Sequence, residues 1–291
     1  MKQSASERFG TLLIAAFLTL FLLATLYPLL HVLFASLSRP SLLMGHRGPI
    51  LAPLGFSTQG YEMLFRNPFI LSGLVNSLVL IVGGTSFSIF MTALAAYVLS
   101  KRYARLTKFF SVVVVVSMLF SGGLIPFYLT VKGVGLYNSL LSLIIPFAMV
   151  TVNLIILRTA FEGIPASLDE SARIDGAGHF TILFRISLPL VMPTIAVLTL
   201  YYAMDKWNGW FYASIFLKDR ELHPLQLILR SLLIDGDNGT MAAGSDNADM
   251  MMLGQSIRYA AIVIGTLPVL ALYPFLQRYF VQGSLAGAVK E

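Results

Sequence analysis

The stretch LDESARIDGAG, residues 168–178, places four charged side chains within eight positions of a very apolar chain. Of the 291 residues, 57% are hydrophobic and only 12% are charged. A soluble domain of this length does not need so much apolar material to fill one core. We therefore expect the lipid bilayer to be the main solvent of the chain, and we expect this charged stretch to lie outside it.

Long uncharged runs lie on both sides of the charged stretch, and each can supply the roughly 20 apolar residues that a spanning helix requires. The pattern predicts an all-α polytopic membrane protein, with a single transmembrane domain over residues 1–291. The six predicted spans are residues 10–36, 70–99, 109–130, 138–161, 187–216 and 257–280. The first run imitates a signal peptide, but it is too long and has no clear cleavage site, so we interpret it as a retained helix.

The connections between the spans predict the topology. Residues 101–108, KRYARLTK, form a short loop with four positive charges and no acid, which is typical of the cytoplasmic face. With six spans, both termini then lie in the cytoplasm. The predicted outer connection 217–256 contains DGDNGTMAAGSDNAD, rich in turn-forming and acidic residues, and is expected to be solvated.

The inner connection 162–188 carries six charges between Glu162 and Arg185. Burying them all in lipid would cost about 15 to 20 kcal/mol, so this segment must face water or another protein. Ser167 to Glu170 reads as a capping box, and Gly176 as a helix stop, which predicts a short helix beneath the membrane. A second helix is expected to lead into Pro189, in the first turn of the next span.

The run ESARIDGAGHFTILFRISLPLVMP, residues 170–193, resembles the EAA loop of ABC importer permeases. Ten positions match in order: Glu170, Ala172, Asp175, Gly176, Ala177, Phe180, Phe184, Ile186, Pro189 and Pro193. The Asn76-Ser77 and Trp207-Asn208 pairs and the tail VQGSLAGAVKE are similar to the carbohydrate-uptake branch, in particular its maltose-permease-like smaller subunit. The last span looks closest to permeases for polysaccharide-derived or lipo-oligosaccharide cargo, including alginate oligosaccharides.

This resemblance implies a coupling helix that docks into a separate cytoplasmic ATPase and passes its closing motion to the spans. The residues that the resemblance assigns to ATPase docking are Leu168, Asp169, Glu170, Ser171, Ala172, Asp175 and Gly176. It also implies a second homologous permease subunit forming a heterodimer, two ATPase copies, an extracytoplasmic solute-binding protein and an oligosaccharide cargo. The expected location is the bacterial cytoplasmic (inner) membrane.

The chain itself has no G-x-x-x-x-G-K-[ST] phosphate loop, so ATP and Mg²⁺ are expected on the partner ATPase and no cofactor on this chain. Cysteine is absent, which excludes thiolate metal sites and cysteine catalysis. The four histidines, spread one per region, give no metal or catalytic pattern. The positive charges are scattered among apolar runs, so nucleic acid is not an expected partner.

Polar residues in or near the spans are the candidate translocation path, because they are costly against lipid. These residues are Asn76, Asn138, Asn153, Lys206, Trp207 and Asn208. The alternative for Trp207 is an aromatic belt at the outer membrane interface, together with Trp210 and Tyr212. Lys206 would favour an anionic sugar, although Asp205 beside it offsets this charge.

Two other functions are weighed against a permease subunit. A secondary transporter predicts two related halves with coupling carboxylates inside the membrane, whereas the acids here cluster in an inner loop. A membrane-embedded enzyme predicts a metal or nucleophile motif, and neither an i, i+4 histidine pair nor G-x-S-x-G occurs. The sequence therefore favours a non-enzymatic permease subunit.

Overall fold

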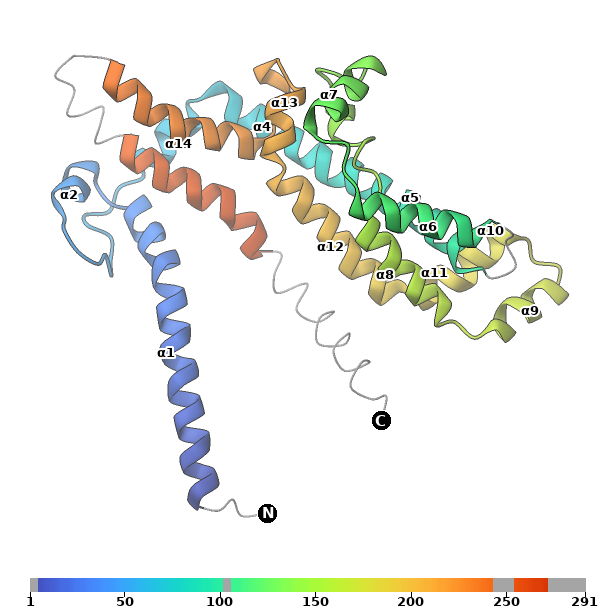
Figure 1. Ribbon diagram of the computed structural model, residues 1–291. Helices are drawn as coiled ribbons and strands as arrows, with labels where there is room; N and C mark the ends of the chain where they lie inside the picture. The colour runs from blue at the N-terminus through green and yellow to red at the C-terminus, as the bar shows by residue number, and fades with distance from the viewer. Residues whose placement is uncertain (1–4, 102–105, 243–253, 272–291) are drawn as a thin grey trace. The chain divides into compact units, whose positions relative to one another are not determined.

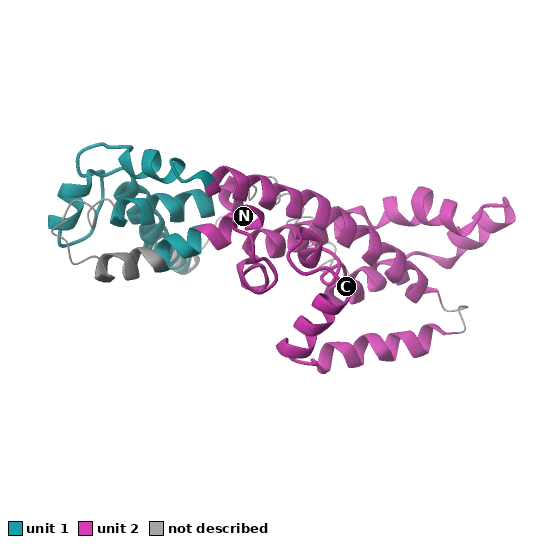
Figure 2. Ribbon diagram, turned by 90° about the horizontal axis from the view of Figure 1, so that it is seen from above, with its two compact units in different colours: residues 1–68, 229–267 teal, residues 69–228, 268–291 magenta. Residues whose placement is uncertain are grey.

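The computed structural model describes residues 5–101, 106–242 and 254–271, and within them it contains helices and no strand. The predicted all-α class is confirmed. The chain divides into two compact units, Met1–Pro68 with Leu229–Leu267, and Phe69–Ile228 with Pro268–Glu291 (Figure 2). The predictions made for Arg102 and Arg105 of the basic loop, for 272–280 of the last span and for the tail lie outside the described residues.

The first unit contains α1 (Ala5–Ser36), α2 (Pro40–Gly45), α3 (Gln59–Phe65) and most of α14 (Leu225–Ala242), together with most of the helix Gly254–Ala271 (Figure 1). The apolar part of α1, Phe9–Ser36, has 28 residues, and its most apolar window is not buried by the rest of the chain. At 1.5 Å per residue this helix is longer than the hydrocarbon core of a bilayer. Its exposed apolar surface fits a lipid-facing helix.

The second unit is built around one long helix that runs from Pro68 to Ser100. It consists of α4 (Pro68–Val79), the π-helix η1 (Leu80–Gly84) and α5 (Thr85–Ser100). α5 packs against α8 (Thr151–Glu162) and α12 (Met192–Asn208). Small buried residues on α5, Ala93 and Ala96, allow close packing of these three helices.

Two of the predicted spans are interrupted. In the range 109–130, α6 (Thr107–Leu119) and α7 (Leu124–Gly133) meet at an angle of 120°. Gly123, at the break, has φ of +84°, which glycine adopts without strain. In the range 138–161 the chain forms a short 3-10 helix, η2 (Leu140–Leu143), and becomes α-helical only from Thr151, so the continuous helix expected there is not formed.

The fifth predicted span also differs. α10 (His179–Thr181), the π-helix η3 (Ile182–Ser187) and α11 (Leu188–Leu190) form one rod that bends by 84° at Val191 before α12. The proline in the first turn of the long helix is therefore Pro193, not the expected Pro189. Gly209 separates α12 from α13 (Trp210–Phe216), and the 3-10 helix η4 (Arg220–Leu222) follows α13.

The number of membrane crossings is bounded by helix length and composition. Among the described residues three helices are long and apolar enough to span a bilayer, or five if each bent pair is one span. The six predicted spans remain a prediction.

The predicted outer connection 217–256 was expected to be solvated, but it contains the helix α14. Leu225, Leu227, Ile228 and Leu229 are buried and stabilise this helix despite the turn-forming residues that follow them.

A buried hydroxyl joins three segments of the second unit. Tyr202 on α12 is fully buried, its hydroxyl hydrogen-bonds Thr92 Oγ1 at 2.7 Å, and it accepts the Val150 N–H at 3.1 Å. Tyr202→Phe leaves both partners unpaired, which costs about 1–3 kcal/mol. We expect a lower unfolding temperature in detergent for Tyr202→Phe, and no change for the exposed neighbour Tyr201→Phe. Equal unfolding temperatures for both variants would contradict this assignment.

Candidate functional site

The charged stretch folds into α9 (Ala166–Ile174), as a short helix outside the long ones. The predicted capping box is wrong, because the helix begins one residue before Ser167 and its N-cap, Pro165, makes no side-chain hydrogen bond. Proline starts this helix with its fixed φ of −56°. Asp169, in the first turn, stabilises the positive end of the helix dipole.

The predicted stop at Gly176 is confirmed, and it has a Schellman geometry. Ala177 N donates to Ala172 O at 2.9 Å, and Gly176 N donates to Arg173 O at 3.0 Å. Gly176 has φ of +83°, a conformation that other residues adopt only at a cost. The two glycine-dependent hydrogen bonds therefore fix the length of α9 and the direction in which the chain leaves it.

The docking residues predicted on α9 divide between two faces. Ala172 is buried in the cluster formed by α5, α8 and α12, so this alanine packs on the chain itself. Glu170, Ser171 and Asp175 are exposed, and the side chain of Leu168 is 42% exposed. Ile174, at the end of the same helix, is 87% exposed. An apolar and acidic face is thus available to another protein.

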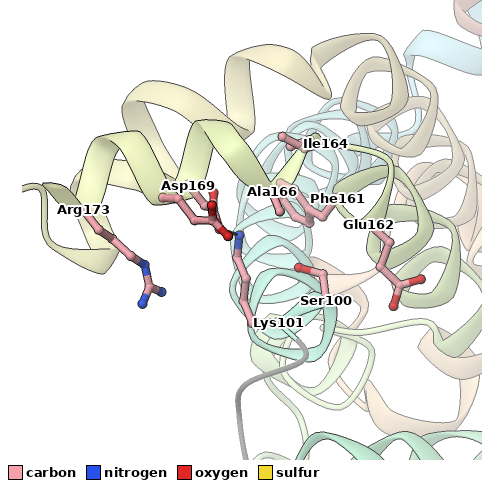
Figure 3. A pocket seen from close by; sticks show the side chains of 9 residues that line it. Ser100, Lys101, Phe161, Glu162, Ile164, Ala166, Asp169 and Arg173 are labelled. Atoms are coloured by element: carbon pink, nitrogen blue, oxygen red, sulfur yellow. Dashed lines mark hydrogen bonds and ion pairs between the residues drawn. The ribbon is translucent and has the colours of Figure 1, made fainter. Parts of the chain in front are cut away.

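Asp169 lies between these faces and forms an ion pair with Lys101, which directly follows α5. Figure 3 shows the Lys101 ammonium and the Asp169 carboxylate meeting. Both side chains line a cavity of about 570 Å³ at the ends of α5 and α8. The cavity is lined by Ser100, Lys101, Phe161, Glu162, Ile164, Ala166, Asp169, Glu170 and Arg173. The start of the basic loop and the coupling helix therefore lie at the same end of this unit, as the predicted cytoplasmic topology requires.

Two predicted path residues hold together a loop that was predicted to lie on the outer side. Asn76 Nδ2 donates to the carbonyls of Glu221 and His223, at 2.6 and 3.2 Å. Asn138, with φ of +59°, accepts the N–H groups of Lys218 and Asp219 on its Oδ1 and donates to Asp219 Oδ2 at 2.7 Å. Both amides thus bind the segment 217–223, a connection between helices.

The other predicted path residues have different surroundings. Lys206 is only 6% exposed, and its Nζ donates to Leu143 O at 2.9 Å and lies 5.4 Å from the centroid of the Phe147 ring. Trp207 is 4% exposed, and Asn153 is also buried. Asn208 is exposed and donates to Met204 O of its own helix. Hydrogen bonds bring Asn76 and Asn138 to one loop, whereas those of Lys206 and Asn208 go to other segments.

Sequence reasoning missed the ion pair that Lys101 forms with Asp169. The basic loop was interpreted only as a sign of topology, and no spacing rule relates Lys101 to an aspartate 68 positions later. It also missed Tyr202 and Thr92, whose hydrogen bond appears only when α5 and α12 are packed. In the described parts of the chain no group of three or more metal-ligating side chains comes together.

The fold and the coupling helix define a class of protein, and comparison with known families agrees. Residues 88–284 match the family described as binding-protein-dependent transport system inner membrane component. The chain belongs to this family and is therefore a permease component of an ABC transporter in the inner membrane, not an enzyme. This membership excludes the secondary transporter and the membrane-embedded enzyme.

Individual relatives resemble the chain over nearly its whole length. It is 40% identical to the polygalacturonan/rhamnogalacturonan transport system permease protein YtcP of Bacillus subtilis, over 98% of this chain and 99% of the relative. It is 39% identical to the protein LplC of the same organism, over 91% of this chain and 90% of that one. A bacterial ABC transporter that imports the acidic polysaccharide alginate has a similar structure, with a TM-score of 0.86, 30% identity and coverage of 96% and 99%.

Proposed function

We propose that this chain is one of two permease subunits of an ABC importer for oligosaccharides that carry uronate carboxylates. It forms half of the translocation path, and the second half comes from a homologous but different subunit. The observation that supports this proposal best is α9, whose Leu168, Glu170 and Ser171 face outward while Ala172 packs against the bundle. A short helix with one anchored and one exposed face is suited to binding in a cleft of another protein.

The free energy for transport comes from ATP hydrolysis by two copies of a separate ATPase, which bind ATP and Mg²⁺. When the ATPase dimer closes, it moves α9, and the permease bundles rock from an inward-facing to an outward-facing state. A loaded solute-binding protein on the outer side favours the same outward-facing state. The ATPase and the binding protein therefore shift the equilibrium between the two states in the same direction. In this arrangement α9 and both termini lie in the cytoplasm.

The nature of the cargo is supported by the relatives. YtcP is named for polygalacturonan and rhamnogalacturonan, and the similar solved transporter imports an acidic polysaccharide. All three polymers carry sugar carboxylates, so a translocation path that accepts carboxylates accounts for all of them. The buried ammonium of Lys206 is engaged by the Leu143 carbonyl, and this makes Lys206 a poor candidate for the carboxylate contact.

Cargo choice is tested with the assembled importer in proteoliposomes. The binding protein, loaded with uronate oligosaccharides, is added on the outer side, and neutral maltodextrins of equal length are the matched control. We expect ATP-dependent accumulation of the uronate oligosaccharides at least about tenfold above the maltodextrins, equivalent to about 1.4 kcal/mol of discrimination. Equal uptake of both, or uptake of maltodextrins alone, would refute the acidic cargo.

A further inference from the structure

We propose that the ion pair between Lys101 and Asp169 is the mechanical tie by which the coupling helix moves α5. This inference rests on the proposed function of α9 and adds a positioning role for Lys101, outside the coupling loop. It concerns what happens after the ATPase has docked: how a displacement of a nine-residue helix reaches the membrane spans.

The packing of α9 alone is a weak connection. Ala172 is its only buried residue, and one methyl group offers little surface through which to push or pull a bundle. The segments that join α9 to its neighbours, residues 163–165 and 175–178, are not helical. A helix held in this way can rotate about its ends without moving the bundle, unless another contact fixes it.

The Lys101–Asp169 pair supplies such a contact. Both side chains are only 14% exposed, so solvent and salt screen their attraction less than at the surface. Asp169 Oδ1 is buried and, among the described residues, has no hydrogen-bond partner, so the carboxylate depends on Lys101 for compensation. Breaking a partly buried pair on one side leaves a charge without compensation, which is costly.

The lysine is itself held by the bundle. Its ammonium lies 4.5 Å from the centroid of the Tyr97 ring on α5, a cation–π geometry. Tyr97 is buried and packs edge to face against Phe161 of α8, with ring centroids 5.8 Å apart. The tie thus begins on α9, passes through Lys101 and Tyr97, and ends in the packed pair of α5 and α8.

The helix at the other end of the tie is suited to transmit motion. Pro68–Ser100 is continuous over 33 residues, and its α5 part packs against both α8 and α12. Since a packed helix moves as a unit, a pull at Lys101 shifts the far end of this helix and the elements that contact it. The tie therefore predicts that transport depends on Lys101 even when the ATPase binds normally.

The test uses the complete importer in proteoliposomes and measures cargo transported per ATP hydrolysed. Lys101→Met and Asp169→Asn each break the tie, and the exchange variant Lys101→Asp with Asp169→Lys rebuilds it with reversed charges. Glu162→Gln is the matched control, because it breaks an ion pair between Arg158 and Glu162 that lies within α8. A second measurement is the amount of ATPase that co-purifies with each tagged variant.

We expect both single variants to retain the ATPase and to lose about fivefold or more of the cargo moved per ATP, in the range of ordinary coupling energies. The exchange variant regains at least half of this loss, and Glu162→Gln behaves as the wild type. Unchanged coupling in the single variants would overturn the tie. Failure of the exchange variant to regain coupling, whether it folds or not, would also overturn it.

The amount of ATPase that co-purifies distinguishes a failure of this inference from a failure of the proposed function. If the wild-type chain brings down no ATPase, the proposed function itself fails. If the wild-type chain retains the ATPase and the single variants lose it, Lys101 and Asp169 act in docking, and the tie is refuted while the proposed function stands.

Discussion

Glu170→Lys is expected to abolish ATP-driven uptake while the chain still inserts into the membrane. Glu170 is exposed on α9 beside Leu168 and Ser171, so the substitution changes the docking face without disturbing the buried core. A lysine at this position would place like charges opposite each other if the ATPase cleft is basic, and such a juxtaposition costs several kcal/mol. The measurement is the amount of ATPase that co-purifies with the tagged variant, and we expect it to fall at least about tenfold.

The control for this experiment is the same change at another exposed carboxylate. Glu62 lies on α3, outside the inner connection 162–188, so Glu62→Lys alters the charge of the chain equally. We expect Glu62→Lys to retain the ATPase. If both variants lose it equally, net charge and not the face of α9 governs binding. If Glu170→Lys fails to insert, the residue has a structural role and this assignment is wrong.

Gly176→Val is expected to weaken ATPase binding although Leu168, Glu170 and Ser171, the exposed residues of α9, are unchanged. A β-branched residue at φ of +83° costs at least about 1–2 kcal/mol. The two hydrogen bonds to the carbonyls of Ala172 and Arg173 are then lost or distorted, and the last turn of α9 unwinds. The expected result is an affinity for the ATPase that is about 5- to 30-fold lower, measured by titration in detergent.

Two other glycine substitutions make this prediction specific. Gly178 has φ of −74° and nothing lies within 4 Å of a Cβ placed on it, so Gly178→Val leaves the affinity unchanged. Gly176→Asn retains more affinity than Gly176→Val, because asparagine tolerates the left-handed region. An equal loss for the valine variants at both positions would show that bulk, and not backbone conformation, is responsible.

The sequence was sufficient for features set by composition and local chemistry. The spans 10–36 and 70–99 correspond to the helices that end at Ser36 and Ser100, because long uncharged apolar runs have few other stable forms in a bilayer. Gly176 was recognisable as a stop for α9, since a glycine after a short amphipathic helix commonly ends it. The exposed position of Glu170 was likewise expected from the cost of burying charge.

Features set by packing were beyond the sequence. Because the chain bends at Val191, the long helix has Pro193 in its first turn and not Pro189. Either proline is compatible with the first turn of a helix, so the sequence alone does not choose between them. The run 138–161 has the composition of a span, yet Lys206 and Tyr202 bind its backbone at Leu143 and Val150 and hold a non-helical path. The resemblance assigns Asp169 only to ATPase docking, and no local pattern indicates its ion pair with Lys101 of the same chain.

The central claim is that α9 lies in the cytoplasm and is gripped by the ATPase. The chain contains no cysteine, so Ser171→Cys, at an exposed position of α9, gives a single labelling site. We predict that a membrane-impermeant maleimide labels it in inside-out vesicles stripped of the ATPase, but not in intact cells, and that adding the ATPase protects it. Labelling from outside the cell, or undiminished labelling in the assembled importer, would contradict the account.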